Sequence, residues 1–251
     1  GYKDNMTHAL PLLRKYGLPA TIFLEAEAVD RRGLTWIHKF FFLRRYKGSR
    51  HIASEYIRMT QDAKLAQQLR AALSGPEESL EYTVKRLLKY DADAGDRGRL
   101  FDTMFRAAGG NEQELLDNAY LSWDDVRAMA GQGISFGCHT LSHPILSSLT
   151  RDEARHEISG ARRLIREKAG IDAGTFAYPW GRVWDFTSET VELLKEEGFL
   201  CAMIMDDASL FPGCCDFFRL SRYPVLSDLN LADILAQASG LYGWFGRRLG
   251  V

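Results

Sequence analysis

Residues 134–144 read Ile-Ser-Phe-Gly-Cys-His-Thr-Leu-Ser-His-Pro, an apolar run followed by two histidines with three residues between them. The run Ile134–Cys138 predicts a short buried β-strand, which is typical of parallel α/β folds. Such folds place their functional groups at the carboxyl ends of the strands, where His139 and His143 stand. Two imidazoles at this spacing can bind one divalent metal ion, so the stretch predicts a metal site at a strand end.

Strands and helices alternate on both sides of this stretch. Before it, Ala20–Leu24 predicts a buried strand. After it comes a long helix that begins at a Thr-x-x-Glu capping box and continues to Ala169, where Gly170 ends it. Further strands are expected at Thr175–Tyr178 and Phe199–Met205. Repeated strand–helix units predict an α/β fold built on a parallel barrel or sheet.

The alternation stops between Gly33 and Tyr120. Four segments there have helical periodicity, Thr35–Tyr46, Asp62–Leu73, Glu77–Tyr90 and Gln113–Tyr120. We therefore expect a mostly helical insertion, residues 33–120, within a single domain spanning residues 1–251. Its aromatic residues Trp36, Phe40, Phe41 and Phe42 either form the core of the insertion or line a substrate groove.

The composition narrows the class of protein. The chain has 251 residues, 46% hydrophobic and 26% charged, with a formal net charge of -1. This is ordinary globular composition without a broad basic field, so we expect no nucleic-acid partner. No apolar stretch approaches the roughly 20 residues that cross a bilayer, so no transmembrane segment is expected. The oligomeric state is left open.

Three local patterns follow one another in a fixed order: Gly-Tyr-Lys-Asp-Asn at residues 1–5, the histidine pair, and Phe-Ala-Tyr-Pro-Trp-Gly at residues 176–181. The ordered set resembles the polysaccharide deacetylase family, carbohydrate esterases with a NodB-like homology domain. The resemblance covers Gly1 to about Asp30 and Tyr120 to about Val225. It implies a metal-dependent hydrolase that removes N- or O-acetyl groups from sugar polymers on a distorted (β/α) barrel.

The family pattern places two aspartates immediately before the glycine that matches Gly1, one as general base and one as metal ligand. The sequence begins at this glycine, so we expect both aspartates, and the first barrel strand, ahead of residue 1. Asp4 fits the first turn of a helix better than it fits the role of a substitute ligand.

The second pattern is intact, and the resemblance assigns His139 and His143 to the metal. Zinc suits two imidazole ligands best, and cobalt, nickel or iron could also occupy such a site. Thr140 and Ser142 would support the ligands by holding their loop through hydrogen bonds.

The third pattern has Ala177 where the commoner family form has an arginine. By resemblance, Tyr178, Pro179 and Trp180 contact the substrate, and the backbone N–H of Trp180 helps to form an oxyanion hole. Farther along, Arg222 either binds substrate or makes an ion pair. The late histidine that serves as general acid in many relatives is missing, because no histidine follows His156.

Two other functions compete with the hydrolase. A catalytically inactive member of the same fold would bind glycans or act as a scaffold. An unrelated metallopeptidase would need a helix through His139–His143, which the preceding strand and Pro144 disfavour. For either deacetylase-like protein the partner is a polysaccharide or glycan. The resemblance implies an extracytoplasmic or cell-envelope location, and a cytoplasmic one stays open.

Overall fold

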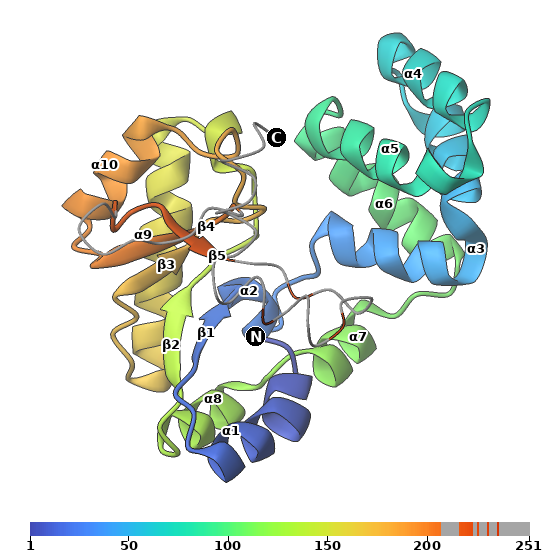
Figure 1. The fold of residues 1–251 in the computed structure, drawn as a ribbon. Helices are drawn as coiled ribbons and strands as arrows, with labels where there is room; N and C mark the ends of the chain where they lie inside the picture. The colour runs from blue at the N-terminus through green and yellow to red at the C-terminus, as the bar shows by residue number, and fades with distance from the viewer. Residues whose placement is uncertain (207–215, 223–224, 226–229, 231–234, 236–251) are drawn as a thin grey trace. The chain divides into compact units, whose positions relative to one another are not determined.

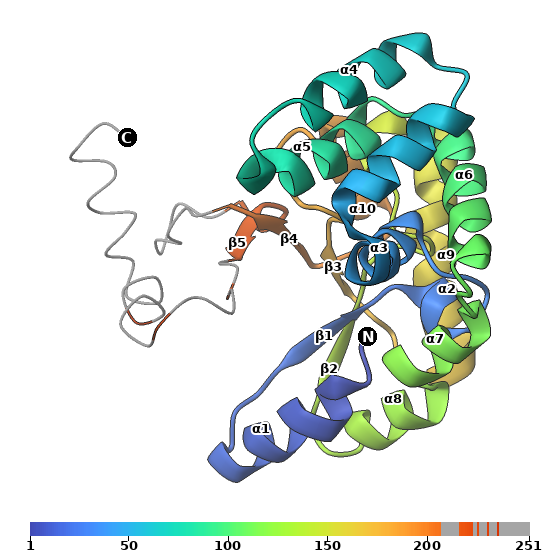
Figure 2. The ribbon, with the colours of Figure 1, turned by 90° about the vertical axis from the view of Figure 1, so that its right-hand side faces the viewer.

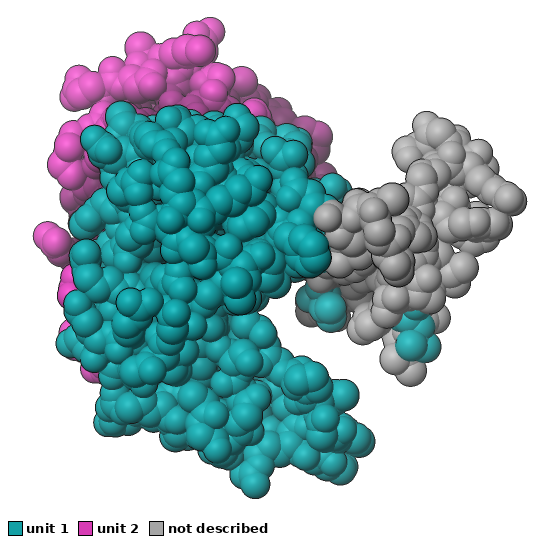
Figure 3. All heavy atoms as spheres, turned by 90° about the vertical axis from the view of Figure 1, so that its left-hand side faces the viewer, with its two compact units in different colours: residues 1–31, 119–251 teal, residues 32–118 magenta. Residues whose placement is uncertain are grey.

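The computed structural model describes residues 1–206, 216–222, 225, 230 and 235 (Figure 1). The chain forms two compact units, one made of Gly1–Arg31 with Ala119–Val251 and the other of Arg32–Asn118. Figure 3 colours them teal and magenta. The candidate site belongs entirely to the first unit.

A five-stranded parallel sheet forms the centre of the first unit (Figure 2). Its strands are β1 (Thr21–Leu24), β2 (Ser135–Cys138), β3 (Thr175–Ala177), β4 (Cys201–Met205) and β5 (Leu220–Arg222). They lie side by side in chain order, as in a (β/α) barrel, whereas the order of a doubly wound sheet reverses. The predicted α/β class is confirmed.

The helices of the first unit precede or follow these strands along the chain. They are the π-helical turn η1 (Asn5–Ala9), α1 (Leu10–Tyr16), α2 (Ala26–Val29), α8 (Trp123–Ala130), the 3₁₀ turn η2 (Leu146–Ser148), α9 (Arg151–Ala169) and α10 (Ser188–Glu196). The longest, α9, contacts α2, α8, α10 and β2. It begins at the predicted capping box of Thr150 and Glu153 and ends at Gly170, whose φ is 71°.

The register of the strands brings their carboxyl ends together. Leu24 is the partner of Cys138, and Cys138 is the partner of Phe176. Gly137 makes this close pairing possible, because a Cβ there would lie 2.5 Å from the Phe23 ring. The residues that follow β1, β2 and β3 therefore emerge at one edge of the sheet.

The second unit is helical. It contains α3 (Trp36–Met59), α4 (Ala63–Leu73), α5 (Glu77–Tyr90), α6 (Ala94–Ala107) and most of α7 (Glu112–Ala119), and α3 is broken at Gly48. Phe40 is fully buried, and its ring lies near those of Trp36 and Phe101, so these aromatics form the core. Phe41 differs, since it is 40% exposed.

Helix α6 was not among the predicted segments. Two glycines near its start, Gly95 and Gly98, weaken the helical pattern in the sequence. Asp93 compensates by accepting a hydrogen bond from the Asp96 N–H at 2.8 Å, which caps the helix. Among all the helices that the structure describes, none combines the length and apolar character needed to cross a membrane.

Candidate functional site

His139 directly follows β2 and is fixed at both its backbone and its ring. Its N–H donates to the Leu24 carbonyl at 2.9 Å, which continues the pairing of β1 with β2. Its Nδ1 lies 2.6 Å from the carbonyl oxygen of Ala177, at the end of β3. A carbonyl oxygen can only accept, so Nδ1 carries the proton and the lone pair resides on Nε2. This tautomer and orientation are those of a histidine that binds a metal through Nε2.

The electrostatic surroundings keep His139 neutral. Burial lowers the pKa of His139 well below its ordinary value, and the nearby His143 and Arg222 act in the same direction. Only the neutral imidazole can donate a lone pair to a cation. His139 is therefore in its metal-binding form at neutral pH.

His143 lies beside His139, with 4.8 Å between the ring centroids and 74° between the ring planes. A tight turn brings the two together, since Thr140 has φ 65° and His143 has φ 59°. The Thr140 hydroxyl donates to the His139 carbonyl at 2.6 Å and accepts from the His143 N–H at 3.0 Å. No helix runs through the pair, so the metallopeptidase alternative is wrong.

Glu157 of α9 anchors this turn from outside. Its carboxylate accepts from the N–H groups of Leu141 at 2.9 Å and Ser142 at 3.0 Å, and from the Ser142 hydroxyl at 2.6 Å. Left-handed φ values at two non-glycine residues cost about 1 kcal/mol or more each, so the turn needs such an external support. Sequence reasoning missed Glu157, whose only signal is a glutamate beside the apolar stripe of a helix.

Removing this anchor should loosen the histidine pair. We expect Glu157→Ala to weaken zinc binding about 10- to 100-fold, the usual range for residues that support metal ligands. Zinc titration by calorimetry measures the change. Glu167→Ala on the same helix is a matched control. Glu167 is exposed, and its ion pair with Arg163 is long, at 4.0 Å. Equal zinc affinities of the two variants would show that Glu157 does not support the metal site.

Trp180, which belongs to the third sequence pattern at residues 176–181, lies beside the histidines. Its ring centroid lies 5.1 Å from that of His143, at an interplanar angle of 69°. Its φ is 63°, and Gly181 follows with φ 74°. The Gly181 carbonyl accepts from the Met205 N–H at 2.7 Å, and a Cβ on Gly181 would lie 2.8 Å from that nitrogen. The glycine thus allows the loop to dock on the end of β4.

Tyr178 and Pro179 are both buried. The Tyr178 ring stacks on Phe186 with a centroid distance of 3.9 Å, and its hydroxyl donates to the Phe218 carbonyl at 3.0 Å. Burial raises the pKa of the Tyr178 phenol, which therefore remains protonated. The Tyr178 contacts hold the loop after β3 in place, and the substrate contacts of Tyr178 and Pro179 stay a prediction.

Arg222 lies in β5, near the end of β1. Its guanidinium lies 5.9 Å from the Phe23 ring centroid, and its Nε donates to the Ile204 carbonyl at 3.4 Å. Its charge is close enough to His139 to affect the pKa of that imidazole. Within the described part of the chain Arg222 makes no ion pair, and its role toward a substrate stays a prediction.

The ring geometry of the two histidines would allow them to supply two ligands to a metal ion. Within residues 1–206 and the short described segments beyond them, no group of three His, Cys, Asp or Glu side chains could hold a metal ion. The ring spacing and the Nε2 lone pair of His139 fit a tetrahedral cation with two imidazole ligands and remaining positions for other groups.

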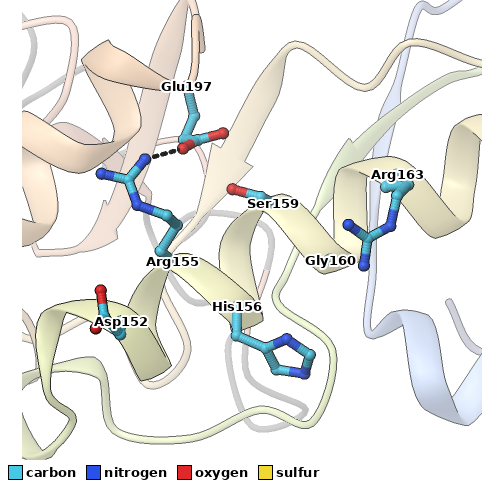
Figure 4. Close-up of a pocket in the computed structure, with 7 residues that line it drawn as sticks. All are labelled: Asp152, Arg155, His156, Ser159, Gly160, Arg163 and Glu197. Carbon is cyan, nitrogen blue, oxygen red and sulfur yellow. Dashed lines mark hydrogen bonds and ion pairs between the residues drawn. The ribbon is translucent and has the colours of Figure 1, made fainter.

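A separate hollow of about 460 Å³ lies along one face of α9 (Figure 4). It includes Arg155, which pairs with Glu197 and, at 2.9 Å, with Glu196. His156 and Arg163 also line it, whereas neither His139 nor His143 does. This hollow is therefore distinct from the candidate metal site.

Comparison with known proteins points to one family. The sequence profile of the family described as polysaccharide deacetylase matches residues 74–202, just over half of the 251 residues. No curated protein matches the chain by sequence.

Two solved structures share the fold of this chain. IcaB from Ammonifex degensii has a TM-score of 0.52 at 16% identity, over 95% of this chain and 69% of that one. A de-N-acetylase from Aggregatibacter actinomycetemcomitans has a TM-score of 0.51 at 12% identity, over 94% and 71%. At these identities the likeness concerns the fold, and it confirms the expected barrel type.

A third structure, the deacetylase PplD from Streptococcus pyogenes in complex with acetate, has a TM-score of 0.42 at 21% identity. The match covers 47% of this chain and 51% of that one, so the chain spans about half the length of PplD.

Proposed function

Since the chain belongs to the polysaccharide deacetylase family, we propose that it acts as a metal-dependent hydrolase that removes acetyl groups from an N-acetylglucosamine-containing polysaccharide. The bond cleaved would be a carbon–nitrogen bond that is not a peptide bond. The observation that carries the proposal is the pairing of His139 with His143 at the sheet edge, with Nδ1 of His139 donating to Ala177 and Trp180 beside the pair. One protein that shares the fold is a de-N-acetylase, which supports cleavage of an amide rather than an ester.

Members of this family are generally metal-dependent, and we assign the cation to Nε2 of His139 and the imidazole of His143. Zinc is the first choice, with cobalt, nickel and iron as alternatives. A divalent cation at this place would supply Lewis acidity, polarising the acyl carbonyl and lowering the pKa of the attacking water.

The protein's own groups would orient the acetyl group and stabilise developing charge. Trp180 forms one wall beside His143, and its backbone N–H is our candidate donor to the oxyanion. Arg222 provides a fixed positive charge toward His139, which suits the departing acetate. Thr140 and Ser142 would hold the turn of His139 and His143. Thr140 accepts from the His143 N–H, and Ser142 donates to Glu157.

We propose that the substrate lies outside the cytoplasm. Deacetylases of this family are often extracellular, and a polymer of the cell envelope is a substrate to which such a protein has access. The partner is thus a glycan, and no nucleic acid is expected because the net charge is -1.

Acetate release tests the proposal directly. The complete-length protein is incubated with zinc, cobalt or nickel and with N-acetylglucosamine oligosaccharides, and both acetate and new primary amines are measured. We expect the two products in equal amounts with at least one metal, and none with a chelator. An O-acetylated glycan in a parallel reaction distinguishes amide from ester cleavage. Release from none of these substrates with any metal would contradict the proposal.

One observation favours a second function, a glycan-binding protein without hydrolase activity. The described residues provide two histidine ligands and no third acidic or histidine ligand nearby. Glycan binding without any acetate release, with a metal present, is the outcome expected of such a protein.

A further inference from the structure

Two large apolar side chains occupy the tip of a turn close to the candidate site. The Asp185 N–H donates to the Arg182 carbonyl at 2.8 Å, which closes a β-turn with Val183 and Trp184 at its two central positions. Val183 is 57% exposed and Trp184 is 61% exposed. Such positions usually hold glycine, proline, asparagine or aspartate. An exposed valine and tryptophan therefore call for a reason other than turn formation.

The backbone beneath these side chains is held firmly. Asp185 is fully buried, and its carboxylate accepts from the Arg182 N–H at 3.0 Å. The Ser147 N–H donates to the Asp185 carbonyl at 2.9 Å, and the Ser147 hydroxyl donates to the Trp184 carbonyl at 2.8 Å. A fixed backbone presents the indole at little further cost in conformational entropy when a ligand binds.

The same contacts place the turn next to the histidines. Ser147 belongs to the loop after β2, four residues beyond His143, and Trp184 belongs to the loop after β3, four residues beyond Trp180. The two loops meet twice, through the rings of His143 and Trp180 and through Ser147 with the turn. Four residues span at most about 14 Å, so Trp184 lies within reach of a sugar chain bound at the histidines.

We propose that Val183 and Trp184 form a platform on which a pyranose ring of the polysaccharide stacks, next to the sugar whose acetyl group is removed. The inference rests on the proposed function, because it takes the glycan at the histidines as its starting point. A pyranose presents an apolar C–H face that suits a flat indole, and its hydroxyls suit the indole N–H at the ring edge. The platform selects polymers over single sugars.

Oligosaccharide length is the variable that tests the platform. A short-to-long series of N-acetylglucosamine oligosaccharides is titrated into the full protein by calorimetry and used as substrate for acetate release. We expect Trp184→Ala to weaken binding of the longer members about tenfold and to raise their KM with kcat nearly unchanged. The monosaccharide should bind the variant and the wild type alike. Trp184→Phe should restore most of the affinity, because a flat ring remains.

The controls separate this inference from the proposed hydrolase. Tyr16→Ala removes an equally exposed aromatic side chain, 62% exposed, at the end of α1, and should change nothing. Binding that depends on Trp184 without acetate release supports the platform and contradicts the hydrolase. Acetate release with equal length dependence in wild type and Trp184→Ala overturns the platform alone. A wild-type protein that binds no oligosaccharide overturns it too.

Discussion

Replacing His139 by alanine should abolish zinc binding and acetate release together. The variant loses an imidazole whose Nδ1–H donates to the Ala177 carbonyl and whose Nε2 would bind the cation. Supporting residues around metals are worth 10- to 100-fold, so loss of a ligand should cost more than about 100-fold in affinity and activity. His143→Ala should have the same effect, since the rings are only 4.8 Å apart. Metal content by mass spectrometry and acetate release measure the two losses.

His156→Ala is the matched control for this experiment. His156 is an exposed histidine of α9 and does not belong to the turn of His139 and His143. It should retain full zinc content and activity. Thermal unfolding verifies that all three variants fold. Zinc bound with wild-type affinity after loss of either site histidine would exclude the assigned metal site.

Replacing Glu25 by glutamine should change how stability depends on pH. Glu25 directly follows β1 and is only 6% exposed, and its Oε1 has no hydrogen-bond partner within the described residues. Burial raises the pKa of Glu25 to about 8 from the ordinary 4.5, and the nearby Glu157 and Glu27 also raise it. The folded protein therefore binds a proton here that the unfolded chain releases.

The sign of the effect follows from this difference in bound protons. Between about pH 4.5 and 8 the folded state holds the proton and the unfolded state does not, so the free energy of unfolding falls as pH rises. The contribution of Glu25 amounts to at most about 1.4 kcal/mol per pH unit, and it ends above the folded pKa. Glutamine is neutral at every pH, so Glu25→Gln should lose this slope and be more stable than the wild type near pH 8.

Urea unfolding at several pH values from 5 to 8 checks this prediction. Glu78→Gln is the control, because Glu78 is exposed in the first turn of α5 and should leave the pH dependence unchanged. Parallel stability curves for wild type and Glu25→Gln would mean that Glu25 is already ionised in the folded protein.

Some features of this site can be predicted from the local sequence. The strands around the histidines were predictable because each is a short, mostly apolar segment bounded by turn residues, and α9 because both of its ends carry capping signals. The spacing of His139 and His143, and of Trp180 within its motif, is local too. Whether these residues bind metal and substrate stays a prediction.

The partners that hold these groups depend on contacts between distant segments. Glu157 reaches a turn some 15 residues earlier, and the tautomer of His139 depends on a carbonyl 38 residues later. The stacking of the Tyr178 ring against Phe186 joins residues eight positions apart. None of these pairings follows a repeat in the sequence, so no local sequence pattern predicts them.

From the sequence alone followed the α/β class, the strand that ends in the histidines and the family resemblance, because each depends on residue order over short distances. Only the tertiary structure decided the proton position on His139, the anchoring of its loop by Glu157, the elevated pKa of Glu25 and the exposure of Trp184. Burial and hydrogen bonding between segments far apart in the chain set all four, and these exist only once the strands have paired and the helices have packed on them.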